Sequence, residues 1–198
     1  MVLAYHLVLS AYGFWLPNDP RGSCSDFVGS KELFRFGKAR KVDSRESTAH
    51  VEHDRQWRMA AKQSLKYPPV RFSGVQARAV GRGFAKAIED LRVTNCACAM
   101  MPDHVHLVVG RSAHSIEDVS TRLKSEASRK LVDESLHPFD ELRNSAGDLP
   151  SVWAEGEWKV FLNSPEAITH EIQYVEENPI KAGLKPQRWS FVTRYVPY

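Results

Sequence analysis

The stretch V-T-N-C-A-C-A-M-M-P-D-H-V-H-L-V-V, residues 93–109, decides the fold of this 198-residue chain. Residues 93–100 and 104–109 are largely apolar, and Met101-Pro102-Asp103 between them is typical of a tight turn. We therefore expect a β-hairpin. Because side chains alternate along a strand, His104 and His106 share one face of the second strand. The apolar residues of that strand, Val105, Leu107 and Val109, lie on the other face.

Amphipathic helices are expected on both sides of this hairpin. Ser73 and Gln76 have the spacing of a capping box, and the apolar residues after them recur at helical intervals, which predicts a helix over residues 74–91. Ser115 is expected to cap a second helix over residues 116–131. Its apolar positions are Ile116, Val119, Leu123, Ala127 and Leu131.

The rest of the chain supplies two more strands and a final helix. Residues 2–11 form a β-rich run, and residues 153–162 contain a second one, W-K-V-F-L. Ser164 and Pro165 open a helix that should end at about Glu177, because Pro179 disfavours helical geometry at the preceding residue. The order predicts an α+β fold, a ferredoxin-like sandwich. Four antiparallel strands would carry two helices on one face and the C-terminal helix on the other.

The final helix carries polar side chains along one line. His170, Tyr174 and Asn178 follow at i, i+4 and i+8, and a separate apolar stripe could hold the helix against the sheet: Ile168, Ile172 and Val175. Two histidines with this spacing often occur by chance, so the pair alone is weak evidence for a metal site. The polar line on the final helix is the second observation that supports such a site. If it covers the histidine face, a phenol and an amide oxygen meet two imidazoles. Such a group offers a nucleophile and three metal ligands.

Two motifs carry a family resemblance. M-P-D-H-V-H-L-V-V, residues 101–109, resembles the histidine-hydrophobic-histidine strand of the HUH endonuclease superfamily. Q-Y-V-E-E-N-P-I-K-A-G-L, residues 173–184, resembles the tyrosine helix of its single-tyrosine transposases. A tyrosine followed by Asn-Pro and then Ala-Gly-Leu is typical of the REP-associated branch, the insertion-sequence-200-like proteins found with repetitive extragenic palindromes. The resemblance covers residues 73–184 in order.

The resemblance implies a metal-dependent single-strand DNA endonuclease and strand transferase that cleaves at or near DNA hairpins. Tyr174 would attack the scissile phosphate and form a 5′-phosphotyrosine, and a 3′-hydroxyl could later reverse the step and rejoin strands. A divalent cation, Mg²⁺ or Mn²⁺, would bind His104, His106 and Asn178. The expected partner is single-stranded or hairpin DNA. We expect a monomer, with a dimer as the alternative.

Two features depart from the family pattern. The segment between the first strand and the first helix, about residues 13–72, is longer than expected, and Asn178 stands where other members place glutamine. We expect residues 1–198 to form one domain with a basic insertion at about 13–72 and a tail at about 185–198. With 42% hydrophobic and 26% charged residues the chain has a globular composition. Three cysteines and the absence of a signal-like or membrane-spanning run predict a reduced, cytoplasmic protein.

Positive charge is concentrated in the insertion, although the whole chain has a net charge of only +3. Between Lys31 and Arg71 there are eleven Lys or Arg against five Asp or Glu. Such a segment suits DNA phosphates, and Trp57, Tyr67 and Phe72 could stack on unpaired bases. The candidate DNA-binding residues are Arg35, Lys38, Arg40, Lys41, Arg58 and Lys62. The alternative is a solvated loop.

Two other readings of the site remain open from the sequence. Cys96 and Cys98 could join the two histidines in a structural zinc site. This requires Met100 to pair with His104, because pairing of Met101 with His104 would place Ala97 and Ala99 on the histidine face instead. The other reading is a catalytically inactive protein that still binds hairpin DNA.

Overall fold

The computed structural model describes all residues except 24, 43–47, 49 and 198. The chain divides into two compact units, which are described separately below. The first unit consists of Met1–Ser10 together with Arg71–Tyr198. The second consists of the intervening segment, Ala11–Val70.

A four-stranded antiparallel sheet forms the centre of the first unit. Its strands are β1 (Ala4–Ser10), β2 (Asn95–Met100), β3 (His104–Gly110) and β4 (Trp158–Leu162). They are ordered β2-β3-β1-β4, so β3 pairs with the strand on each side and is central. The predicted α+β class and the antiparallel sheet are confirmed.

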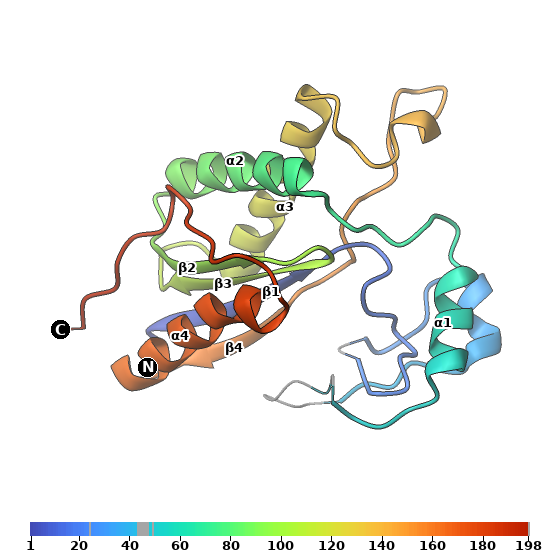
Figure 1. Ribbon diagram of the computed structural model, residues 1–198, viewed down its shortest axis with the longest axis horizontal. Coiled ribbons are helices and arrows are strands. Elements are labelled where there is room, and N and C mark those ends of the chain that lie inside the picture. Colours follow the sequence, from blue (N-terminus) through green and yellow to red (C-terminus); the bar gives the residue numbers. More distant parts are fainter. Residues whose placement is uncertain (24, 43–47, 49, 198) are drawn as a thin grey trace. The chain divides into compact units, whose positions relative to one another are not determined.

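Three long helices cover the two faces of this sheet. Helices α2 (Gly74–Leu91) and α3 (Ile116–Asp133) pack against each other on one face, and α4 (Pro165–Lys181) lies on the opposite face (Figure 1). Ser73, Ser115 and Ser164 each accept a hydrogen bond from a backbone N–H of the first turn, which explains where these helices begin. The predicted layers are confirmed. A short 3₁₀ turn, η2 (Asp140–Leu142), follows α3.

The sheet face toward α2 and α3 is largely apolar. Leu7 and Leu9 of β1 and Val105, Leu107 and Val109 of β3 are all buried. The two helices approach closely at Gly83 of α2, where a Cβ atom would lie 2.5 Å from Cα of Ala127. Glycine at this position therefore lets the helix backbones come into contact.

The opposite face holds α4 through its apolar stripe. Ile168, Ile172 and Val175 pack with small strand residues, among them Ala97 and Ala99. The helix does not end at about Glu177 as predicted but continues through Pro179 to Lys181. Pro179 is buried, and its carbonyl accepts a hydrogen bond from the Leu184 N–H. Packing and this closing bond offset the N–H that proline lacks.

The segment after α4 runs beside β2, the outer strand on one side of the sheet. The Gln187 side chain accepts a hydrogen bond from the Met100 N–H and donates one to the Met100 carbonyl, both at 2.8 Å. Farther along, the Thr193 N–H donates to the Asn95 carbonyl. The tail is therefore attached to the outer edge of β2.

The second unit has a small core of its own. Helix α1 (Arg55–Gln63) and the 3₁₀ helix η1 (Lys31–Phe36) contribute to it. The core residues are Leu16, Val28, Leu33, Phe36 and Ala61. The buried Asp19 carboxylate pairs with Arg21, whose guanidinium lies 3.9 Å from the centroid of the Trp15 ring. The insertion is thus a packed unit.

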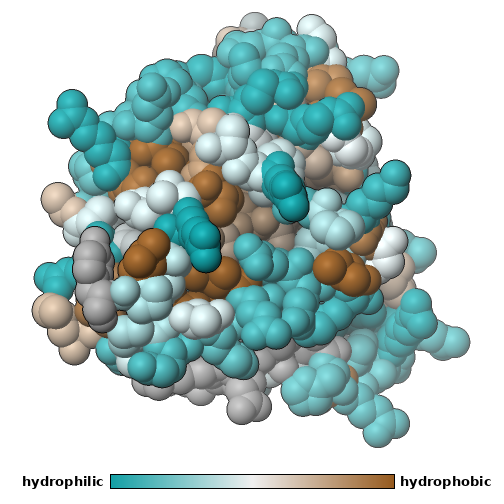
Figure 2. Space-filling model, turned by 60° about the vertical axis from the view of Figure 1, so that its left-hand side comes forward, coloured by the Kyte–Doolittle hydropathy of each residue, from teal (hydrophilic) through white to brown (hydrophobic). Residues whose placement is uncertain are grey.

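Several large hydrophobic side chains are exposed at the surface. On the face drawn in Figure 2 they form separate patches among hydrophilic residues.

Within the described part of the chain, no helix is both long and apolar enough to cross a membrane.

Candidate active site

The histidine face of β3 presents His104 and His106 side by side. Their ring centroids are 4.8 Å apart. The Nδ1 atom of His104 lies 2.8 Å from Oδ1 of Asp103, and Oδ2 of the same carboxylate accepts a hydrogen bond from Arg71. Asp103 therefore links a cation to the ring and favours a proton on Nδ1. With the proton there, Nε2 is the nitrogen suited to bind a metal ion.

His106 is more deeply buried than His104. Burial lowers the pKa of His106 well below 6.5, and the neighbouring imidazoles of His104 and His6 lower it further. The ring is therefore neutral near pH 7, the form that can bind a metal. Among the described residues its one hydrogen bond joins Nδ1 to Nε2 of His6, at 2.9 Å. The other ring nitrogen of His106, Nε2, is therefore the one that could bind a metal ion.

His6 and Glu171 extend this contact into the protein. His6 lies on β1 and is only 2% exposed. Its Nδ1 atom is 3.1 Å from Oε2 of Glu171 on α4, although the ring N–H is not well aligned with that oxygen. The same contact lowers the pKa of Glu171. The half-buried Glu171 carboxylate thus contacts His6, and His6 contacts His106.

Tyr174 lies beside these rings. Its ring centroid is 5.9 Å from that of His106 and 5.8 Å from that of His6, in edge-to-face geometry. All three residues belong to one chain, so the tyrosine helix sits over its own histidines. The Tyr174 hydroxyl makes no hydrogen bond within the described residues. It is therefore available to a ligand.

Asn178 lies one turn beyond Tyr174 on α4. Its Nδ2 donates a hydrogen bond of 3.1 Å to the Tyr174 carbonyl, which fixes the orientation of the amide. Oδ1 has no hydrogen-bond partner in the described part of the chain. The two imidazoles and this amide oxygen would together make a mixed nitrogen and oxygen donor set. These residues fit a divalent cation that keeps further positions for water and phosphate oxygens.

The zinc reading of the sequence is wrong, and the register explains why. Ala99 pairs with His106 and Met100 with Val105, which puts Cys98 on the opposite face from the histidines. Burial raises the pKa of Cys98 far above that of an ordinary thiol, so the thiolate needed to bind zinc is disfavoured. Cys96 packs in the apolar cluster under α4. Within the described residues, no three His, Cys, Asp or Glu side chains converge on one metal position.

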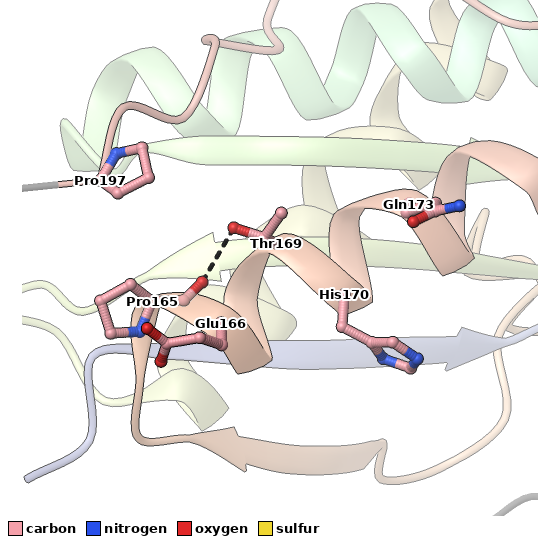
Figure 3. A pocket seen from close by; sticks show the side chains of 6 residues that line it. All are labelled: Pro165, Glu166, Thr169, His170, Gln173 and Pro197. Atoms are coloured by element: carbon pink, nitrogen blue, oxygen red, sulfur yellow. Dashed lines mark hydrogen bonds between the residues drawn. The ribbon is translucent and has the colours of Figure 1, made fainter.

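His170 does not join the other histidines, although it shares the stripe of Tyr174 on α4. It is exposed and lines a shallow pocket at the start of the helix with Pro165, Glu166, Thr169, Gln173 and Pro197. Figure 3 shows His170 pointing away from Thr169, whose hydroxyl donates to the Pro165 carbonyl. The pocket contains none of the four predicted site residues.

The candidate DNA-binding residues lie in the second unit and differ in exposure. Arg35, Lys38 and Arg40 are exposed, and Lys41 pairs with Asp26. Arg58 is half-buried, and Lys62 donates to the Phe14 carbonyl. Trp57 is half exposed, whereas Phe72 is buried against Trp153 and cannot stack on a base as predicted.

Sequence reasoning missed His6 and Glu171. A signal for His6 was present, because it is a single histidine in an apolar strand, on the face opposite Tyr5, Leu7 and Leu9. Glu171 lies three residues before Tyr174, on the same side of the helix. Only the pairing of β1 with β3 and the seating of α4 bring the two residues to His106.

Comparison with known proteins gives matches among solved structures alone. No family model matches the chain, and no curated protein matches it. A REP-associated tyrosine transposase bound to a REP hairpin has 10% sequence identity and a TM-score of 0.48, over 98% of this chain and 93% of the other. A candidate transposase from Deinococcus radiodurans R1 has 16% identity and a TM-score of 0.42, over 89% of this chain and 91% of the other.

Proposed function

We propose that this protein is a metal-dependent single-strand DNA endonuclease and strand transferase, a single-tyrosine transposase-like enzyme acting at or near DNA hairpins. One observation carries the proposal. The Tyr174 ring lies 5.9 Å from the ring of His106 within the same chain, so a nucleophile and a metal-binding face are adjacent. Reacting groups must be held close to contact distance for an efficient displacement, and this arrangement supplies that closeness.

Three residues would hold the cation, Mg²⁺ or Mn²⁺. His104 and His106 would offer Nε2, because each Nδ1 already has a partner, and Asn178 would offer Oδ1. When bound, the cation supplies Lewis-acid polarisation of the scissile phosphate. The depressed pKa of His106 keeps that ligand neutral at physiological pH.

Tyr174 would perform the covalent step. Its Oη attacks phosphorus, a P–Oη bond forms, and the bond from phosphorus to the 3′-oxygen breaks. The phenolic proton leaves to solvent, and the departing oxygen takes a proton to become a 3′-hydroxyl. Because a phenol is a better leaving group than an alkyl alcohol, a later 3′-hydroxyl can reverse the step and join strands.

The DNA contacts are proposed for the insertion. Arg35, Lys38 and Arg40 are exposed, as a phosphate-binding surface requires. Replacing these three and Lys41 together with alanine should weaken hairpin binding and flatten its dependence on salt. Unchanged affinity and salt slope would contradict this part of the proposal.

The deciding experiment is an adduct assay. Protein mixed with Mn²⁺ and a labelled single-stranded oligonucleotide carrying a hairpin should form a covalent complex that survives denaturing electrophoresis. Tyr174→Phe should form none, because it lacks the hydroxyl. Tyr5→Phe, a matched change on β1, should form the complex normally. Hairpin binding without an adduct in the unaltered protein would indicate a DNA-binding protein without catalysis.

A further inference from the structure

His6 is enclosed by the proposed active site without being one of its ligands. Its ring centroid lies 5.1 Å from His106, 5.4 Å from Trp158 and 5.8 Å from Tyr174. At 2% exposure it has almost no contact with solvent. A buried imidazole needs partners for both nitrogens, because an unpaired polar atom in the interior costs free energy.

Its two nitrogens face different chemical groups. Nε2 is 2.9 Å from Nδ1 of His106, and Nδ1 is 3.1 Å from Oε2 of Glu171. Neither Nδ1 nor this oxygen has another hydrogen-bond partner among the described residues. A small rotation of either side chain would therefore align a hydrogen bond that the distance already permits.

The direction of each hydrogen bond follows from Glu171. An ionised carboxylate can only accept, and the contact with His6 lowers the pKa of Glu171, which keeps it ionised. In the neutral form of His6 the proton then lies on Nδ1, 3.1 Å from the carboxylate, and Nε2 accepts from Nδ1 of His106. His106 must therefore donate from Nδ1, which leaves the lone pair on its Nε2.

We propose that His6 and Glu171 are positioning residues that hold His106 in the tautomer whose Nε2 can bind the divalent cation. The inference rests on the proposed metal role of His106. Partners of this kind fix both the proton and the orientation of a metal-binding imidazole, and their loss typically weakens metal affinity about 10- to 100-fold. His104 has the simpler arrangement, a direct contact with Asp103.

Glu171→Gln is the sharpest test, because it preserves shape and removes the charge. Glutamine no longer requires a proton on Nδ1 of His6, because its NH₂ group can donate to that nitrogen; the His6 proton then lies on Nε2, and His6 becomes the donor to His106. His106 would then carry its proton on Nε2 and lose the metal-binding lone pair. Glu176→Gln is the matched control, since Glu176 is exposed on the same helix.

Two measurements read the result. Long-range proton–nitrogen NMR of metal-free, ¹⁵N-histidine-labelled protein, assigned with His106→Gln, reports the tautomer of His106. Mn²⁺ titration followed by electron paramagnetic resonance gives its dissociation constant. We expect a proton on Nδ1 in the unaltered protein and the control, a proton on Nε2 in Glu171→Gln, and Mn²⁺ binding about 10- to 100-fold weaker in that variant.

A second variant tests the role of His6 itself, independently of Glu171. His6→Phe keeps a ring against Trp158 and Tyr174 but removes the acceptor for His106, so Mn²⁺ binding should weaken to a similar degree. Thermal unfolding of each variant checks that the protein is folded.

Two outcomes would separate this inference from the proposed function. An unchanged tautomer and unchanged Mn²⁺ affinity in Glu171→Gln would overturn the positioning role and leave the proposed function standing. A tautomer that responds to Glu171→Gln in a protein that binds no Mn²⁺ would support the hydrogen-bonded chain and contradict the metal-dependent function.

Discussion

The two faces of the sheet are built from the same strands but serve different purposes. Toward α2 and α3, β3 presents Val105, Leu107 and Val109, all buried. Toward α4, the same strand presents His104 and His106, with His6 from the neighbouring strand. One face stabilises the fold, and the other gathers polar groups that cost stability when buried. Adjacent residues of one strand can therefore be assigned to separate tasks.

The largest expected effect follows from His106→Ala. Loss of a metal ligand should remove several kcal/mol of transition-state stabilisation, which is about a thousandfold or more in the cleavage rate. Hairpin affinity should change little, because phosphate and stacking contacts supply most of it. Single-turnover cleavage and a binding titration measure the two effects. A cleavage rate within tenfold of that of the unaltered protein would contradict the role of His106 as a metal ligand on the polar face.

Leu107→Ala tests the next residue of the same strand. Leu107 is completely buried on the apolar face, so its truncation should lower the free energy of unfolding by about 2 to 5 kcal/mol. Denaturant unfolding measures that loss. The Mn²⁺ affinity of the folded protein should not change. A large fall in Mn²⁺ affinity without a loss of stability would contradict the assignment of stability to the apolar face and of metal binding to the histidine face.

Gly83→Ala tests the closest approach of α2 and α3. The added methyl group would meet backbone atoms of Ala127, at 2.5 Å from Cα and 2.6 Å from N, and neither can turn aside. We expect a loss of about 1 to 3 kcal/mol, despite the better helix propensity of alanine. A rise in the unfolding temperature would show that the helices can separate without cost.

The smallest effect concerns the pH dependence of stability at His137, in the segment between α3 and η2. Burial lowers the pKa of His137 below 6.5, and its Nδ1 accepts a hydrogen bond from the Phe139 N–H. As the pH falls below 6.5, the unfolded chain takes up a proton at this residue while the folded protein does not, so stability is lost. His137→Asn retains an acceptor without titrating. The free energy of unfolding of this variant should fall less steeply than that of the unaltered protein between pH 6.5 and 5. Parallel plots of the free energy of unfolding against pH would show that His137 does not contribute to the loss.

The elements could be predicted because their signals are local. Ser73, Ser115 and Ser164 mark helix starts within a few residues, and strand alternation places the two histidines on one face. The end of α4 was wrong by four residues, since the preference against helix before proline is weaker than the packing of buried Pro179.

The candidate site was only half accessible to sequence reasoning. The positions of His104, His106, Tyr174 and Asn178 follow from short patterns. His6 is a hundred residues from His106, and its hydrogen bond depends on the register between β1 and β3. Glu171 depends on where α4 settles. Such long-range contacts leave little trace in one sequence, although a single histidine in an apolar strand is a reason to look for one.

The attachment of Gln187 to Met100 has a consequence for how the protein behaves at high concentration. An outer strand with unpaired N–H and C=O groups can recruit a strand from another molecule, which begins aggregation. Here one side-chain amide imitates a neighbouring peptide group, and Thr193 repeats the contact at Asn95. The tail thus occupies backbone groups at both ends of β2 that could otherwise pair with a strand of another molecule. Removal of the residues after Leu184 would expose these groups and favour aggregation.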